Sequence, residues 1–233
     1  MSKRPANKAM AATLAAERRR QRTFWASLIA VAVLLVAGII GYGIYASHES
    51  GEVRIPKGTA AGDDTGLAQG TGKAKVDLYL DYLCPVCKQF EDSVGPTLDG
   101  LVQQNKATLI VHPVAFLDRL SNGTEFSTRA SAAAACAADG GKFPEFNRAL
   151  FARQPGENTP GLPNETIIEI GKGVGLGDDF ASCVDERTYR GWASHVTDGA
   201  SERGVTGTPT VLVNGTKVDN DPAKITAAVT AAQ

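Results

Sequence analysis

The tetrapeptide Cys84-Pro85-Val86-Cys87 stands between a strand pattern and a helix pattern, and this order restricts the folds open to the chain. Before it, residues 76–81 alternate apolar and polar side chains, which is typical of a strand. After it, apolar side chains recur at helical spacing as far as residue 102. Residues 108–111 are rich in branched apolar side chains and predict a second strand. A strand, a helix and a strand joined by short segments predict a parallel unit with both cysteines at the amino end of its helix.

The spacing of the two cysteines favours thiol–disulfide chemistry. The amino end of a helix offers unpaired amide donors and a positive dipole end, which stabilise a thiolate and lower the pKa of Cys84 from about 8.5. Cys84 is therefore the predicted nucleophile. Cys87, one turn into the helix, is close enough for a disulfide but more shielded, and is the predicted resolving thiol. Pro85 suits the first helical turn.

Two other interpretations of the pair are a purely structural disulfide and half of a zinc site. A structural zinc site requires four ligands. The remaining cysteines, Cys136 and Cys183, stand singly, and the histidines are His48, His112 and His195. Neither His112 nor His195 has a partner at ligand spacing, so we expect both to be packed or surface side chains. A redox pair is the favoured interpretation.

Residues 24–46 contain no charged side chain and predict a transmembrane helix. At 1.5 Å per residue this segment spans about 34 Å, which exceeds the bilayer core of about 30 Å. A cleaved signal peptide is the alternative, but its apolar region is usually about 7 to 15 residues long, and no clear cleavage site follows here. Basic residues at positions 18–22 also loosely resemble a twin-arginine signal.

The charge distribution predicts how the chain is oriented in the membrane. Residues 1–23 carry seven basic side chains and one acidic one, a net charge of +6, and should stay in the cytoplasm by the positive-inside rule. Residues 47–233 carry a net charge of −7 and should be extracytoplasmic, held at the cell membrane by a single span. This acidic balance offers no basic surface to nucleic acid. Cysteines in such a compartment can pair.

The outward-facing part divides into a linker and a domain. Residues 47–72 are rich in Gly, Thr, Ala and Asp and predict a flexible linker, with a short edge strand at residues 53–55. Residues 73–233 form the predicted domain. Its predicted helices cover residues 127–138, 143–153 and 164–174, a pair within residues 178–204, and residues 222–232. Trp192, Phe146 and Phe151 fall in these helices and are expected in the core. Asn214-Gly215 suits the two-residue turn of a hairpin.

Together these features resemble the thioredoxin-fold disulfide oxidoreductases. The resemblance covers roughly residues 73–232 and includes the sequence "GVTGTPTVLVNG" ahead of the last helix. The helical insertion, about residues 118–204, is similar to the DsbA branch in its membrane-anchored Gram-positive or actinobacterial form. Further matching marks are Asp81-Tyr82, Lys88, Phe90 and the segment "FPEFNRALFARQ". The resemblance implies an α/β thioredoxin fold with a helical insertion, preceded by one transmembrane helix.

The resemblance also assigns roles to the "TP" dipeptide, Thr208-Pro209. In the family this proline is cis and faces the active-site disulfide, and the backbone before it pairs with an extended substrate segment. Thr208 and Pro209 therefore join Pro85 and Val86 as expected supports of the active site. Because the redox group is the cysteine pair itself, no bound cofactor and no metal are expected.

Two positions depart from the family pattern. Related sequences often have an acid six residues before the first cysteine that assists proton transfer, whereas this chain has Leu78, with Asp77 and Asp81 nearby. Strongly oxidising relatives have a histidine where this chain has Val86. An apolar side chain donates no hydrogen bond to the thiolate, so the couple should be less oxidising.

Cys136 and Cys183 lie in two predicted helices of the insertion. A bond between them would close a loop of about 48 residues, for which the chain-entropy relation gives about 4 kcal/mol of stabilisation. A structural disulfide is the favoured interpretation, and a second active couple is the alternative.

The expected function is a membrane-tethered thiol:disulfide oxidoreductase that introduces disulfide bonds into reduced, exported proteins. The resemblance implies re-oxidation by a membrane oxidase of DsbB-like or vitamin K epoxide reductase-like type. One alternative is an extracytoplasmic reductase or isomerase that uses the same residues. Another is a non-catalytic chaperone or peptide-binding module.

Overall fold

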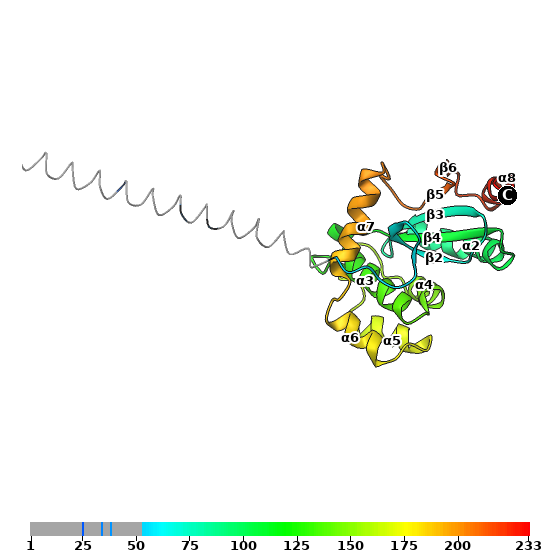
Figure 1. Ribbon diagram of the computed structural model, residues 1–233. Coiled ribbons are helices and arrows are strands. Elements are labelled where there is room, and N and C mark those ends of the chain that lie inside the picture. The colour runs from blue at the N-terminus through cyan, green and yellow to red at the C-terminus, as the bar shows by residue number, and fades with distance from the viewer. Residues whose placement is uncertain (1–24, 26–33, 35–37, 39–52) are drawn as a thin grey trace, which may run out of the picture. The chain divides into compact units, whose positions relative to one another are not determined.

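The computed structural model describes Trp25, Leu34, Gly38 and residues 53–233 (Figure 1). The strands are β1 (Thr59–Ala60), β2 (Asp63–Gln69), β3 (Ala74–Leu80), β4 (Ala107–Pro113), β5 (Thr210–Val213) and β6 (Thr216–Val218). The helices are α2 (Pro85–Gln103), α3 (Phe126–Asp139), α4 (Phe143–Ala152), α5 (Asn164–Gly173), α6 (Asp178–Asp185), α7 (Arg190–Glu202) and α8 (Pro222–Ala231). A 3-10 helix, η1 (Asp118–Leu120), precedes α3.

The described strands form one sheet in the order β1-β2-β4-β3-β5-β6. β3 and β4 are parallel, with Leu78 opposite Val111, and every other neighbouring pair is antiparallel. The predicted strand–helix–strand unit is thus confirmed, with α2 as the connection between its parallel strands. Cys84 follows the carboxyl end of β3, a central strand of the sheet.

Helices cover both faces of this sheet. α2 and α8 pack together on one face, where Leu78 of β3 and Leu98 of α2 border the same small cavity. α7 packs on the other face, where Arg203 at its carboxyl end bonds to Thr65 of β2. α3 contacts α4, α5, α6 and α7 and forms the centre of the helical insertion (Figure 1). The predicted insertion between the second and third strands of the thioredoxin-like unit is confirmed.

The prediction of a flexible linker over residues 47–72 is wrong for its second half. β1 and β2 lie in that range, and β2 pairs with β4 so that Leu67 is opposite Val111. Gly66 is required there, because a Cβ would overlap the side chains of Ile110 and His112. Local strand preference is weak in this stretch, so pairing with β4 and burial of Leu67 form the strand. Residues 53–55, predicted as an edge strand, have no regular structure.

The core of the insertion is aromatic, as predicted. Trp192, Phe146 and Phe151 are fully buried. Burying each such side chain contributes roughly 1.5–3 kcal/mol. Phe146 meets Phe180 edge to face at 5.3 Å between ring centroids, which joins α4 to α6. The insertion therefore packs around its own apolar cluster as well as against the sheet.

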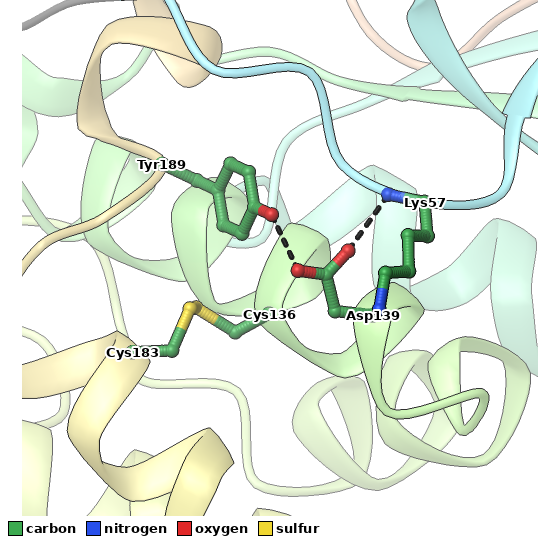
Figure 2. The surroundings of a disulfide bond; sticks show 5 residues. All are labelled: Lys57, Cys136, Asp139, Cys183 and Tyr189. Atoms are coloured by element: carbon green, nitrogen blue, oxygen red, sulfur yellow. Dashed lines mark hydrogen bonds between the residues drawn. A yellow bond between two sulfur atoms is a disulfide. The ribbon is translucent and has the colours of Figure 1, made fainter.

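A disulfide links the insertion's helices covalently. Cys136 of α3 is bonded to Cys183 of α6, with their Cα atoms 6.0 Å apart. Beside it, Asp139 accepts hydrogen bonds from the backbone N–H of Lys57, at 2.7 Å, and from the hydroxyl of Tyr189 (Figure 2). The carboxyl end of α3 thus fastens α6, the start of α7 and the segment that enters β1.

The carboxyl-terminal hairpin follows the prediction. Asn214 and Gly215 form its turn with positive φ values of 47° and 80°, which asparagine and glycine tolerate. The Asn214 side chain also accepts a hydrogen bond from the N–H of Lys75, at 2.9 Å, and so ties the turn to β3.

The predicted transmembrane helix, residues 24–46, and the basic segment before it lie outside the described residues, apart from Trp25, Leu34 and Gly38. The first part of the predicted linker, to residue 52, also lies outside them. Over the part of the chain that the structure describes, no helix has both the length and the apolar character needed to cross a bilayer.

Candidate active site

Cys84 caps the amino end of α2. Its backbone is extended, with φ −77° and ψ 114°, and Pro85 occupies the first helical position, as predicted. The Cys84 carbonyl accepts hydrogen bonds from the N–H groups of Cys87, at 3.0 Å, and Lys88, at 3.2 Å. The first turn of α2 contains no acidic side chain. The Cys84 sulfur therefore sits at the positive end of the helix, where a thiolate is favoured.

The two cysteines are free thiols of unequal exposure. Cys84 is 7% exposed and Cys87 is 2% exposed. Between them, the apolar side chain of Val86 is 55% exposed and stands on the surface beside the pair. An incoming sulfur therefore reaches Cys84 more readily than Cys87, which matches the predicted division into nucleophile and resolving thiol.

The environment moves the pKa values of the two thiols in opposite directions. Hydrogen bonding from the Cys87 thiol, aided by the backbone N–H groups of Cys87 and Val86, lowers the pKa of Cys84 to about 6 against the opposing effect of burial. Burial, followed by the hydrogen bond to Cys84, raises the pKa of Cys87 well above its usual value. The reduced site therefore holds one thiolate, on Cys84, at neutral pH.

The Thr208-Pro209 loop lies directly against the dithiol. The peptide bond between these residues is cis, as the resemblance implied. When Cys84 is protonated, its thiol donates to the carbonyl oxygen of Thr208, with 3.6 Å between sulfur and oxygen. Thr210 then begins β5, which pairs with β3. The fold thus brings together the predicted residues Cys84, Thr208 and Pro209 from opposite ends of the domain.

Two side chains hold the loop before Cys84, one in α4 and one just after it, and neither was predicted as a site residue. Gln154 donates from Nε2 to the carbonyl oxygens of Tyr82 and Cys84, both at 2.9 Å. Asn147 accepts a hydrogen bond from the Tyr82 hydroxyl, also at 2.9 Å. Both lie in the segment "FPEFNRALFARQ", which Gln154 ends. Their spacing of seven residues, about two helical turns, was the sequence signal that both side chains could face the same loop.

Asp81 fixes the same loop from the other side. Its buried carboxylate accepts hydrogen bonds from the N–H of Leu83 at 2.9 Å, the hydroxyl of Ser127 at 2.7 Å and the N–H of Leu117 at 2.9 Å. Burial nevertheless raises the pKa of Asp81 to about 6. The side chain is thus committed to joining the active-site loop to η1 and α3.

This chain has Leu78 where related sequences often have an acid, and the acidic side chains near Leu78 face in different directions. Leu78 is buried under α2 and borders a cavity of about 20 Å³ together with Glu91 of α2. Burial raises the pKa of Glu91. Asp77 bonds instead to His112, at 3.1 Å, on the sheet face that packs against α7. The carboxylates of Asp77 and Asp81 are therefore committed to other contacts, and neither takes the place of the family carboxylate at Leu78.

The histidines lie away from the two thiols wherever the structure describes them. His112 is buried and bonds to Asp77 and to the Thr65 carbonyl, at 3.0 Å, while His195 lies 3.2 Å from Asp64. His48 is outside the described residues. The described histidines therefore do not complete a four-ligand zinc site with Cys84 and Cys87.

A separate cluster of Asp63, Asp77 and His112 places three ligand atoms within 4.8 Å of one another. Lys75 already lies 3.1 Å from Asp77 and 3.5 Å from Asp63, and Arg203 lies 3.5 Å from Asp63. These cations balance the carboxylates, so the cluster is complete as a partly buried ion-pair network.

The sequence of the domain that carries this site also matches a known protein family. Residues 63–231 match the family described as thioredoxin. Among curated proteins, the serine/threonine-protein kinase PknE of Mycobacterium tuberculosis is 27% identical over 146 residues, or 60% of this chain. The chain spans only about a quarter of that relative's length, 26%.

Solved structures match at higher identity and over most of each chain. The oxidised DsbA of Mycobacterium tuberculosis has a TM-score of 0.64 and 33% identity, covering 71% of this chain and 91% of that one. The reduced disulfide oxidoreductase DsbG of the same organism has a TM-score of 0.62 and 34% identity, covering 77% and 84%. From its sequence match and its structural likeness, the chain belongs to the thioredoxin family and is a thiol:disulfide oxidoreductase of the DsbA type.

Proposed function

We propose that this oxidoreductase works as a dithiol oxidase that introduces disulfide bonds into exported proteins. The observation that carries the proposal is the lowered pKa of Cys84, to about 6, beside the raised pKa of Cys87. A stabilised thiolate stabilises the reduced form, and a stable reduced form makes the disulfide form a better oxidant. The exposed side chain of Val86 adds no hydrogen bond to the thiolate, which limits this effect.

The reaction transfers two electrons from substrate to enzyme. A substrate thiolate attacks the Cys84 sulfur of the Cys84–Cys87 disulfide, and Cys87 leaves as a thiolate that takes up a proton. A second substrate thiolate then attacks the substrate sulfur of the mixed disulfide and expels the Cys84 thiolate. The substrate leaves oxidised and the enzyme is left as the dithiol. No bound cofactor is needed, because a membrane oxidase of DsbB-like or vitamin K epoxide reductase-like type restores the disulfide.

The redox potential decides between oxidase and reductase or isomerase. Full-length protein is equilibrated with glutathione buffers, and the fraction of Cys84–Cys87 disulfide is measured by alkylation and mass spectrometry. A potential towards −120 mV supports the oxidase, and one near −270 mV contradicts it. A tenfold change in the equilibrium constant corresponds to about 30 mV for this two-electron couple.

Two cysteine variants test the division of labour. With Cys87→Ala, the Cys84 thiolate can still attack a disulfide of an exported protein and expel one of its sulfurs as a thiolate, but the mixed disulfide that forms cannot be resolved from within, so such mixed disulfides should accumulate. With Cys84→Ala, they should be absent. If Cys84→Ala keeps full biological activity, the protein acts as a chaperone or peptide-binding module rather than an oxidase.

We also propose that residues 24–46 anchor the protein in the cell membrane, with residues 1–23 in the cytoplasm and the catalytic domain outside. The support is the uncharged length of this segment and the net charge of +6 before it. The proposal predicts that the protein resists carbonate extraction and that protease added to spheroplasts digests its catalytic domain. Release into the soluble fraction, or protection of the domain, contradicts it.

A further inference from the structure

A cleft in the helical insertion is lined by three arginines from two helices and a connecting segment. Arg129 lies in α3, Arg187 between α6 and α7, and Arg190 in α7. The cleft has a volume of about 900 Å³. Its lining residues fall between positions 123 and 190, so it is a different place from the dithiol and its cis-proline loop.

The three guanidinium groups are held in different ways. Arg129 donates to the carbonyl oxygens of Thr124, at 2.9 Å, and Leu162, at 2.8 Å, so it is fixed in place by neutral acceptors. Arg190 donates to both carboxylate oxygens of Glu125, each at 2.9 Å. The Arg187 side chain has no hydrogen bond or ion pair to any residue that the structure describes. The cleft therefore holds positive charge beyond what its own partners neutralise.

Two of these charges repel each other. Burial and then the charge of Arg187 lower the pKa of Arg129. An anion between the two guanidinium groups would remove that repulsion. Guanidinium groups present paired N–H donors that match the oxygen atoms of carboxylates and phosphates.

The backbone supports the same conclusion. Glu125 and Arg187 have left-handed φ values of 52° and 54°, while the other described non-glycine residues with positive φ are all asparagines. Asparagine tolerates this conformation, whereas for other residues it costs roughly 1–2 kcal/mol. Both costly positions line the cleft, and strained backbone gathers at functional sites.

The amino end of a helix faces the same space. Asn164 and Glu165, the first residues of α5, line the cleft, and Pro163 before them supplies no side-chain cap. The positive end of the α5 dipole therefore adds to the field of the arginines. Below the arginines, a recess of about 20 Å³ is lined by Ala132, Ala133 and Val184.

We propose that this cleft is an oxyanion-binding site, in which Arg187, Arg129 and Arg190 hold a carboxylate or phosphate group at the amino end of α5. Glu125 and Glu165 also line the cleft and limit its net charge, so the ligand is a small anionic group rather than a polyanion. The recess is water-sized and admits no apolar substituent larger than about a methyl group.

Calorimetric titration of the full-length protein tests the site. Inorganic phosphate and acetate are titrated separately, with sodium chloride keeping ionic strength constant. We expect saturable binding of at least one anion and a loss of at least tenfold in affinity with Arg187→Gly. Glycine suits φ 54°, so this variant removes the guanidinium without straining the fold. Arg148→Ala, which removes an arginine from α4 that pairs with Asp99, should bind like the parent.

The two anions distinguish the source of the ligand. Tighter binding of phosphate indicates a phosphate-bearing ligand, and tighter binding of acetate indicates a carboxylate. The proposal is wrong if neither anion gives saturable binding, or if Arg187→Gly binds as well as the parent while its circular dichroism and Cys84 thiolate absorbance are unchanged.

Discussion

The side-chain amide of Gln154 lies 2.9 Å from the carbonyl oxygen of Cys84, although the two residues are 70 positions apart. The same amide nitrogen reaches the carbonyl of Tyr82, so one side chain of the insertion holds both ends of the turn that delivers the nucleophile. The insertion is therefore part of the active site and not only a cover over the sheet.

Replacing Gln154 with leucine should loosen this turn. Two carbonyl groups lose a donor, and at roughly 1 kcal/mol for each hydrogen bond the free energy of unfolding should fall by about 2 kcal/mol. The pKa of Cys84 should rise as well, because a looser turn holds its sulfur less firmly at the amino end of α2. Denaturant unfolding and thiolate absorbance near 240 nm measure the two effects. Gln103→Leu, at the exposed far end of α2, is the control and should change neither.

The lowered pKa of Cys84 sets the pH dependence of the reduced protein. With a pKa of about 6, the rate of alkylation of Cys84 should rise through pH 6 and level off by pH 7 to 8. At pH 7 about nine-tenths of Cys84 is thiolate, against a few per cent of an ordinary thiol. A rate that keeps rising through pH 8 to 9 would contradict the structure.

The same shift makes the stability of the reduced form depend on pH. Because the folded pKa lies below the unfolded one, the contribution of Cys84 is fully present above about pH 9 and is lost as the pH falls towards 6. The oxidised protein has no such titration. Unfolding the two forms in parallel at pH 6 and pH 8 measures the effect below the range in which the raised pKa of Cys87 opposes it, and equal pH dependence in both forms would rule it out.

Asp81 should act in the opposite sense. Its pKa is raised from 3.8 to about 6, so the folded state binds this proton more tightly than the unfolded state does. Its contribution to the free energy of unfolding therefore falls as the pH rises from about 4 to 6, by about 2 to 3 kcal/mol. Asp81→Asn should abolish this dependence, whereas Asp198→Asn, at an exposed position of α7, should retain it. Parallel stability curves for the parent and Asp81→Asn would show that Asp81 does not titrate in this range.

Removing the Cys136–Cys183 bond should destabilise the fold and spare the redox chemistry. The two cysteines are 47 positions apart, and the chain-entropy relation gives about 4 kcal/mol for a loop of this length. The double variant Cys136→Ala/Cys183→Ala should lose about this much free energy of unfolding. Its Cys84 pKa should match that of the parent, and a loss below 1 kcal/mol would show that packing alone holds α3 to α6. Cys84→Ala/Cys87→Ala serves as the matched double control.

Local patterns were enough to predict most of the elements. Alternation predicted β3, helical spacing predicted α2, and Asn214-Gly215 predicted the β5–β6 turn. β2 was missed because its sequence, DDTGLAQ, carries little apolar or branched content, and its place is decided by β4 and by the close approach at Gly66. A pattern within the chain cannot report a pairing that depends on a partner strand about 40 residues away.

The same limit applies to the site. Cys84 and Cys87 were readable from spacing, because their roles follow from the amino end of one helix. Thr208 is 124 positions from Cys84, and only the family resemblance pointed to it. Asn147 and Gln154 had no chemical signature of their own, because an amide in α4 or just after it is ordinary until the fold places it against the loop.

The position of Lys57 has a mechanical consequence for a protein held by its amino-terminal end. A pull on that end loads the hydrogen bond from Lys57 to Asp139. Asp139 lies one helical turn beyond Cys136, which is covalently joined to Cys183. Tension therefore passes into a crosslinked pair of helices before it reaches β3 or the dithiol that follows it. If residues 24–46 anchor the protein as proposed, a force on the anchor would therefore load the second pair of cysteines, which takes no part in the redox chemistry, ahead of the redox site.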